Sequence, residues 1–80
     1  MRLDKFLKVS RLIKRRTIAN ELCSIGRVEI NAKPAKPAAE VRPGDTVSIR
    51  QGERVLRVRV EDIREHVAKA DATALYTVLE

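Results

Sequence analysis

Apolar side chains at the start of the chain recur at helical spacing. Leu3, Phe6 and Leu7 stand three and four positions apart, so residues 2–9 are predicted to form a short amphipathic helix whose apolar face enters a core. Asp4 lies in the first turn of this helix, where a negative charge interacts favourably with the helix dipole.

A second helix is predicted over residues 18–25, after a basic connector at residues 10–16. Thr17 precedes this helix and can cap its first turn, and Gly26 fits the left-handed position that commonly ends a helix. The apolar stripe of the helix is expected to face the core, and Cys23 beside it is expected to be a core residue. The stripe consists of Ile18, Leu22 and Ile25, with Ala19 alongside.

Beyond Gly26 the apolar period changes to two, which is typical of strands. Val28 and Ile30 predict a first short strand, and two longer strands are predicted over residues 46–50 and 54–63. The residues of the longer strands that are expected to face inward are Val47, Ile49, Leu56, Val58 and Val60.

The end of the last strand is marked by a break in this alternation. Ile63 is out of phase with the preceding apolar positions, so a bulge or a strand end is expected near Glu61 and Asp62. Asp71 is predicted to cap a short C-terminal helix. The apolar residues of that helix are Ala74, Leu75 and Val78.

Turns and loops separate these elements. Residues 31–33 and 51–52 are predicted turns, and Pro43-Gly44 within residues 42–45 suits a type II turn. Ala32 tolerates a positive φ poorly, so another turn type is an open alternative there. The pattern predicts one α+β domain over residues 1–80, in which two short N-terminal helices pack on a small, mostly antiparallel sheet.

Charge is distributed unevenly along the chain. Residues 1–16 hold seven Lys and Arg but one acidic residue, so they carry the whole net charge of +6. The remaining ten Lys and Arg are balanced by ten Asp and Glu. A concentrated positive field attracts a polyanion, so this segment is the candidate binding surface.

The candidate contacts are cations near the starts of the two helices and in a later loop, with Arg16 as the leading one. Asp4 could orient a neighbouring arginine or pair with Lys8 one turn away. Arg57 and Arg59, on the outward face of a strand, are expected to be solvated and ion-paired. The proposed RNA contacts are Arg2, Lys5, Lys8, Arg11, Lys14, Arg15, Arg16 and Lys36.

The remaining chemistry is sparse. Cys23 and His66 are each the only residue of their kind, so neither a disulfide nor a common zinc motif can form within the chain, and no catalytic set is recognised. We therefore expect no enzyme activity, no cofactor and no metal. A small domain without disulfides suggests a reducing compartment, so a cytoplasmic protein is expected. With two aromatic residues, recognition of RNA by shape and phosphate contacts is favoured over base stacking.

Several short motifs together resemble the RNA-binding domain named after small-subunit ribosomal protein S-four. They are Arg2-Leu3-Asp4-Lys5-Phe6-Leu7, Arg15-Arg16-Thr17 before Ala19 and Leu22, Gly26 with Val28, Ile30 and Asn31, then Lys36-Pro37 and Pro43-Gly44-Asp45 before Val47. The resemblance covers about residues 1–50 and implies the S-four-like (alpha-L) fold, with residues 53–80 as a C-terminal strand and tail.

Over its full length the chain resembles the RqcP (YabO) family, which is similar to the ribosome-associated fifteen-kilodalton heat-shock protein. The resemblance rests on an isolated domain that ends in a strand and the segment Leu75-Tyr76-Thr77. It implies ribosome-associated quality control: binding to rRNA and peptidyl-tRNA on obstructed large ribosomal subunits, in support of alanine tailing by an RqcH-like factor. A monomer without membrane contact is expected.

Three alternatives remain open. The chain could be a heat-shock-type rescue factor for large subunits that carry nascent chains. It could be the RNA-targeting domain of an RNA-modifying enzyme, although the motif begins directly after Met1, which favours a complete protein. It could also be a protein-interaction module, whose binding would be insensitive to salt.

Overall fold

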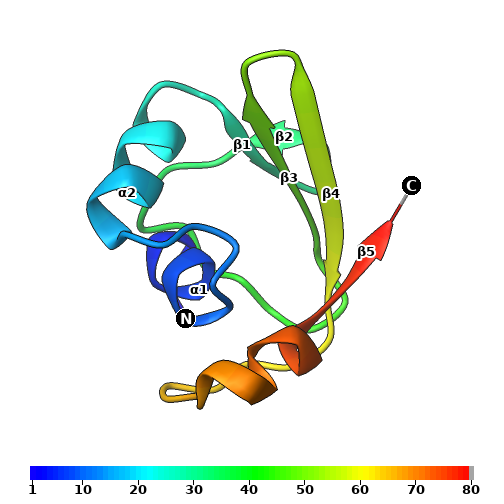
Figure 1. Cartoon of the computed structure of the whole chain (residues 1–80). Coiled ribbons are helices and arrows are strands. Elements are labelled where there is room, and N and C mark those ends of the chain that lie inside the picture. Colours follow the sequence, from blue (N-terminus) through cyan, green and yellow to red (C-terminus); the bar gives the residue numbers. More distant parts are fainter. Residues whose placement is uncertain (80) are drawn as a thin grey trace.

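The computed structural model describes residues 1–79 and begins with two helices that lie on one side of a sheet (Figure 1). α1 spans Leu3–Val9 and α2 spans Arg16–Ser24. Leu3, Phe6 and Leu7 are completely buried, so the apolar stripe predicted for the first helix is confirmed.

The start and the buried face of α2 differ from the prediction. The N-cap is Arg15, so Thr17 lies inside the helix and does not cap it. The helix buries Ala19 and Cys23, whereas Ile18 and Ile25 are 40% and 66% exposed. α2 packs against α1, and small side chains such as Ala19 allow two helix backbones to approach closely. Of the predicted stripe, Leu22 is partly buried against the core.

The end of α2 is a Schellman motif, as the position of Gly26 predicts. Gly26 has a φ of 78°. Its N–H donates to the Cys23 carbonyl at 3.1 Å, and the Arg27 N–H donates to the Leu22 carbonyl at 2.9 Å. These two bonds satisfy carbonyls that the helix itself leaves without partners, and they turn the chain into the first strand.

Five strands follow in one sheet of order β2-β1-β3-β4-β5, in which every neighbouring pair is antiparallel. The predicted α+β class is therefore confirmed, while β2 and β5 were not predicted as strands. The strands are β1 (Val28–Ile30), β2 (Lys33–Pro34), β3 (Thr46–Gln51), β4 (Arg54–Val60) and β5 (Tyr76–Leu79).

The inner face of the sheet completes the core beneath the helices. The predicted inward-facing residues Val47, Ile49, Val58 and Val60 are buried. Leu56 also lies on the inner face, as predicted, but it is 37% exposed. It pairs with Ile49 near the tip of the β3–β4 hairpin, which extends beyond α1 (Figure 1).

The C-terminal region contains a 3₁₀ helix, η1 (Lys69–Leu75), followed directly by β5. The predicted C-terminal helix is therefore correct only in part. Val78 lies in the strand opposite Val58, because Tyr, Thr and Val favour the pleated surface of a sheet over a helix. The N-cap of η1 is Ala68 and not Asp71. β4 ends at Val60, in agreement with the strand end expected just after it.

The turns at residues 42–45 and 31–33 hold different residue types at their positive-φ positions. Gly44 has a φ of 95°, and the Asp45 N–H donates to the Arg42 carbonyl at 3.1 Å, which is the predicted type II turn. Asn31 and Ala32 have φ values of 51° and 68°, so Ala32 adopts the strained conformation. The Asn31 side chain accepts a bond of 2.9 Å from the Thr46 N–H, which anchors the turn.

Candidate nucleic-acid interface

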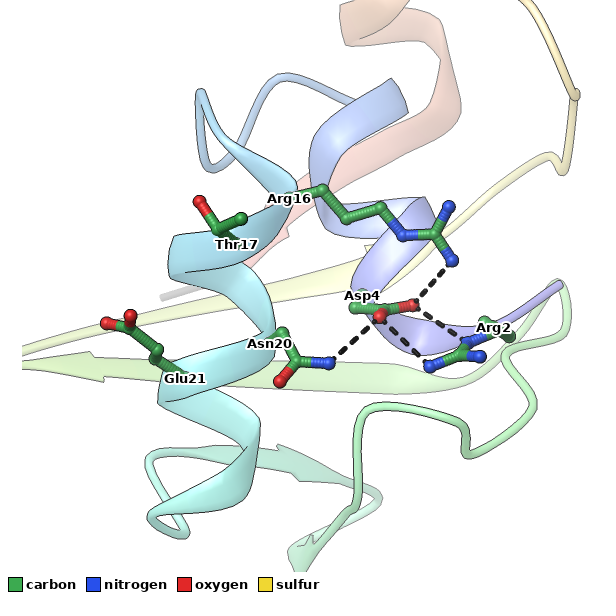
Figure 2. Close-up of a pocket in the computed structure, with 6 residues that line it drawn as sticks. All are labelled: Arg2, Asp4, Arg16, Thr17, Asn20 and Glu21. Carbon is green, nitrogen blue, oxygen red and sulfur yellow. Dashed lines mark hydrogen bonds and ion pairs between the residues drawn. The ribbon is translucent and has the colours of Figure 1, made fainter.

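Asp4 is a buried carboxylate in the first turn of α1, with 2% of its surface exposed. Arg2 approaches it from the N-cap position of the same helix (Figure 2). Arg2 Nε donates to Asp4 Oδ1 and Arg2 Nη2 donates to Asp4 Oδ2, each at 3.2 Å. Two parallel bonds of this kind fix the plane of the guanidinium group.

α2 supplies two further donors to the same carboxylate. Arg16 Nη2 lies 3.3 Å from Asp4 Oδ1, and Asn20 Nδ2 lies 3.3 Å from Asp4 Oδ2. Arg16 and Asn20 are four residues apart and therefore share one face of the helix. Asp4 thus joins both helices and orients two arginines, and we call Arg2, Asp4, Arg16 and Asn20 the arginine clamp.

The clamp keeps Asp4 ionised. Burial by itself raises the pKa of this carboxyl, but the hydrogen bonds from Arg16, Asn20 and Arg2, together with the charge of Arg16, outweigh burial, so the pKa lies below its ordinary value. Of the two roles considered for Asp4, the structure shows the orientation of arginines. Lys8, the alternative partner one turn away, forms no ion pair within the described residues 1–79.

Both arginines of the clamp also face solvent. The side chains of Arg2 and Arg16 are 51% and 46% exposed. They border an open hollow of about 500 Å³ that is also lined by Thr17, Asn20 and Glu21. A guanidinium group has five N–H donors, so each arginine keeps donors for an anion after binding Asp4.

The start of α2 adds backbone donors to this region. No side chain within residues 1–79 caps its N-terminus, and its first turn holds no acidic residue. In α1, by contrast, the Leu3 and Asp4 N–H groups donate to carbonyls of the loop at residues 37–39. Lys14 and Arg15, both exposed, directly precede α2, so cations and free amides occur together where a phosphate would bind.

The structure does not gather all the predicted contacts in one place. Lys5 is ion-paired with Glu65 of the C-terminal segment. Lys8 and Arg11 are exposed on α1 and on the corner after it, and Arg11 has a φ of 62°. Lys36 borders a separate hollow beside the C-terminal end of α2. The compact part of the predicted site therefore consists of the residues at the starts of the two helices.

Sequence reasoning missed Asn20 as a member of the site. The available signal was its spacing, because Asn20 is a polar residue one helical turn after Arg16. Thr17 and Glu21 line the same hollow, but their side chains point away from Asp4 (Figure 2). Their place at the rim could not be read from the sequence without the packing of the two helices.

Within the described residues, the other side chains that could bind a metal or react do not form a cluster. No three His, Cys, Asp or Glu side chains of residues 1–79 are close enough to hold a metal ion. His66 is exposed. Cys23 is buried, as predicted, and burial together with the charge of Asp4 raises its pKa to about 11. No helix in this range is long and apolar enough to span a bilayer.

Comparison with known proteins identifies a domain family and relatives of nearly the same length. The family model described as the S4 domain matches residues 1–47. The RQC P-site tRNA stabilizing factor of Bacillus subtilis is 48% identical over all 80 residues, which cover 93% of that protein. The protein of the same name from Halalkalibacterium halodurans is 50% identical over 78 residues, which are 98% of this chain and 89% of the relative.

A solved structure has a closely similar fold. The structure described as trimeric Heat Shock Protein 15 of Vibrio cholerae superimposes with a TM-score of 0.90 at 31% sequence identity. The match covers 99% of this chain and 81% of the Vibrio chain. The similarity thus extends through the sheet and the C-terminal segment, beyond the range of the family model.

Proposed function

Because the chain belongs to the S4 domain family and, within it, to the RQC P-site tRNA stabilizing factors, we propose that it binds structured RNA and stabilises P-site tRNA on obstructed large ribosomal subunits. The observation that carries this proposal is the arginine clamp. Asp4 holds Arg2 and Arg16 in fixed orientations with donors left for phosphate, so the guanidinium groups lose little conformational freedom when RNA binds.

Recognition by shape and phosphate contacts suits the side chains that the fold leaves accessible. Phe6 is completely buried and Tyr76 is partly buried against the core, so the chain exposes little aromatic surface for base stacking. Arginines at helix starts bind the backbone of a structured RNA without reading its bases. This mode of binding suits a factor that acts on structured tRNA and rRNA.

The finer parts of the proposal concern partners. We propose that the clamp contacts rRNA of the large subunit while the protein supports peptidyl-tRNA, and that an RqcH-like factor performs alanine tailing on the same subunit. The chain itself acts as a binding factor and not as an enzyme. A protein that works on ribosomes acts in the cytoplasm, and this is the compartment we propose.

A second candidate is supported by the similarity to Heat Shock Protein 15 of Vibrio cholerae. In that case the chain would rescue large subunits that carry nascent chains without taking part in tailing. The Vibrio protein is described as trimeric, whereas a monomer is predicted for this chain. Loss of alanine tails after deletion of the protein would distinguish the first candidate from the second.

The clamp can be tested with one charge reversal and a matched control. Arg16→Glu should abolish co-sedimentation with large ribosomal subunits at physiological salt. Arg64→Glu is the control, since Arg64 is similarly exposed and ion-paired, with Asp62, but lies in the C-terminal segment. If four cations each contact a phosphate, wild-type affinity should fall with salt at a log–log slope of roughly −3 to −4. Equal sedimentation of the two folded variants would contradict the proposed face.

A further inference from the structure

The face of the sheet that points away from the helices carries a group of arginines. Val47 and Ile49 of β3 are buried in the core, so their neighbours Ser48 and Arg50 point to the opposite side. Arg57 of β4 pairs with Ser48 and therefore shares this outer face. Arg27 joins them, since its carbonyl accepts a bond of 2.8 Å from the Arg50 N–H.

These arginines surround shallow depressions on either side of Ser48. Arg27 and Arg50 line one hollow, together with Glu29 and Ser48. Arg57 lines a second hollow of about 310 Å³ that shares the same Glu29 and Ser48. Ser48 is only 9% exposed although it points outward, because longer side chains flank it in the adjacent strands. The outer face thus has Ser48 near its centre, with the arginines and the half-exposed Val55 around it.

Three acidic side chains form ion pairs with other cations, away from these arginines. Glu40 pairs with Arg42, Asp62 with Arg64, and Glu65 with Lys5. Residues 17–80 as a whole carry no net charge. The outer face of the sheet nevertheless carries more positive than negative charge, because Arg27, Arg50 and Arg57 lie there with Glu29. Within residues 1–79, the ion pairs leave Arg27, Arg50 and Arg57 without an acidic partner.

The prediction of an ion-paired outer face is correct for one arginine and wrong for another. Arg59 Nε lies 3.1 Å from Glu61 Oε2, whereas Arg57 forms no such pair within the described residues. Glu29 is the acidic residue that remains among the arginines, and it lowers the positive potential at the centre of the face.

We propose that the outer face of the sheet, through Arg27, Arg50 and Arg57, is a second RNA-binding surface that contacts a phosphate backbone. All three cations are arginines, whose planar donors match phosphate oxygens in pairs. The sheet separates this surface from the arginine clamp, which lies on the helix side (Figure 1). The two surfaces therefore contact different stretches of RNA, and the second extends beyond the function proposed for the clamp.

Binding of the full chain to a labelled RNA hairpin with a continuous duplex stem tests the second surface. Arg50→Gln combined with Arg57→Gln should reduce the magnitude of the log–log salt slope by about 0.9 for each phosphate that the variant no longer binds. Glu29→Gln should have the opposite effect and strengthen binding at low salt, because it removes the negative charge between the arginines. A purely structural role of these residues would not give opposite signs.

The control is Arg64→Gln with Lys69→Gln, which removes the same charge from the C-terminal segment. A slope change in the control as large as that in the outer-face variant would overturn the proposal, as would an unchanged slope in the outer-face variant. In an Arg16→Glu background, residual hairpin binding at low salt should vanish when the outer-face substitutions are added. If Arg16→Glu alone removes all binding and the outer-face variant binds normally, the second surface fails while the clamp stands.

Discussion

Asp4 and Arg16 are 12 positions apart in the sequence, and their side chains meet at 3.3 Å where α1 and α2 pack together. The buried carboxylate of Asp4 therefore has two roles. It connects the helices, and it holds an arginine whose remaining donors face solvent. Stability and RNA binding are therefore coupled at Asp4, and substitutions in the arginine clamp can separate the two.

Replacing Asp4 with Asn should weaken both properties. The amide keeps the shape of the side chain but removes the charge that attracts two guanidinium groups, and hydrogen bonds to charged groups contribute about 1.5–3 kcal/mol. We expect a loss of this order in the free energy of unfolding, measured by urea denaturation. RNA affinity should fall as well, although the substitution makes the protein more positive. An increase in affinity would show that net charge, and not orientation, governs binding.

The stability of the wild-type protein should depend on pH in the acidic range. The folded-state pKa of Asp4 lies below its unfolded value of about 3.9. The contribution of Asp4 is therefore complete above the unfolded pKa and is lost as the pH falls through the folded pKa. Denaturation curves between neutral pH and about pH 2 should show a shallower decline for Asp4→Asn. Parallel curves for the two proteins would argue against an ionised Asp4 in the folded state.

Asn20→Ala should cost about 0.5–1.5 kcal/mol of unfolding free energy, since it removes one donor to Asp4. The neighbouring Glu21 provides the control, because it is exposed and lies on the same helix without bonding to the clamp. Glu21→Ala should leave thermal unfolding nearly unchanged. If both variants melt alike, Asn20 does not support the carboxylate.

Ala32→Gly should stabilise the protein by up to about 1 kcal/mol. Ala32 has a φ of 68°, a left-handed conformation that costs a residue with a Cβ about 1–2 kcal/mol, part of which is offset by the greater freedom of glycine in the unfolded chain. Ala38→Gly serves as the control, since Ala38 is exposed and does not have a positive φ. The unfolding free energy of each variant is compared with that of the wild type. A decrease for Ala32→Gly would contradict the prediction.

The Cys23 thiol should be unreactive in the folded protein. The side chain is buried, and its pKa is raised to about 11, so little of the reactive thiolate is present at neutral pH. Alkylation followed by mass spectrometry should show slow modification in native buffer and fast modification in urea. Rapid labelling of the native protein would mean that α2 opens readily.

The sequence predicted the elements whose signals are local. The spacing of Leu3, Phe6 and Leu7 was sufficient for α1, because one helix turn brings these residues onto one face. Gly26 was sufficient for the end of α2, because a left-handed position favours glycine. The alternation of Val47, Ile49, Val58 and Val60 was sufficient for the long hairpin. The concentration of cations in residues 1–16 likewise marked the region of the candidate site.

Tertiary packing decided the features that depend on residues distant in sequence. Ile18 and Ile25 satisfy the helical period but are exposed, because the face of α2 that is buried carries Ala19 and Cys23. Val78 lies in a strand because β4 offers it a partner. The period of a segment defines its faces, but the neighbouring elements determine which face is buried.

By itself, the sequence determined the order of the helices and the main strands, the position of the basic N-terminal segment, and the family to which the chain belongs. Only the tertiary structure showed that Asp4 orients Arg2 and Arg16 and that Asn20 completes the arginine clamp. It also showed that, within residues 1–79, Arg27, Arg50 and Arg57 form no ion pair. The physical reason is the range of the interactions. Helical and strand periods arise within a few residues, whereas an ion pair depends on a distance of a few ångströms that the packing of whole elements sets.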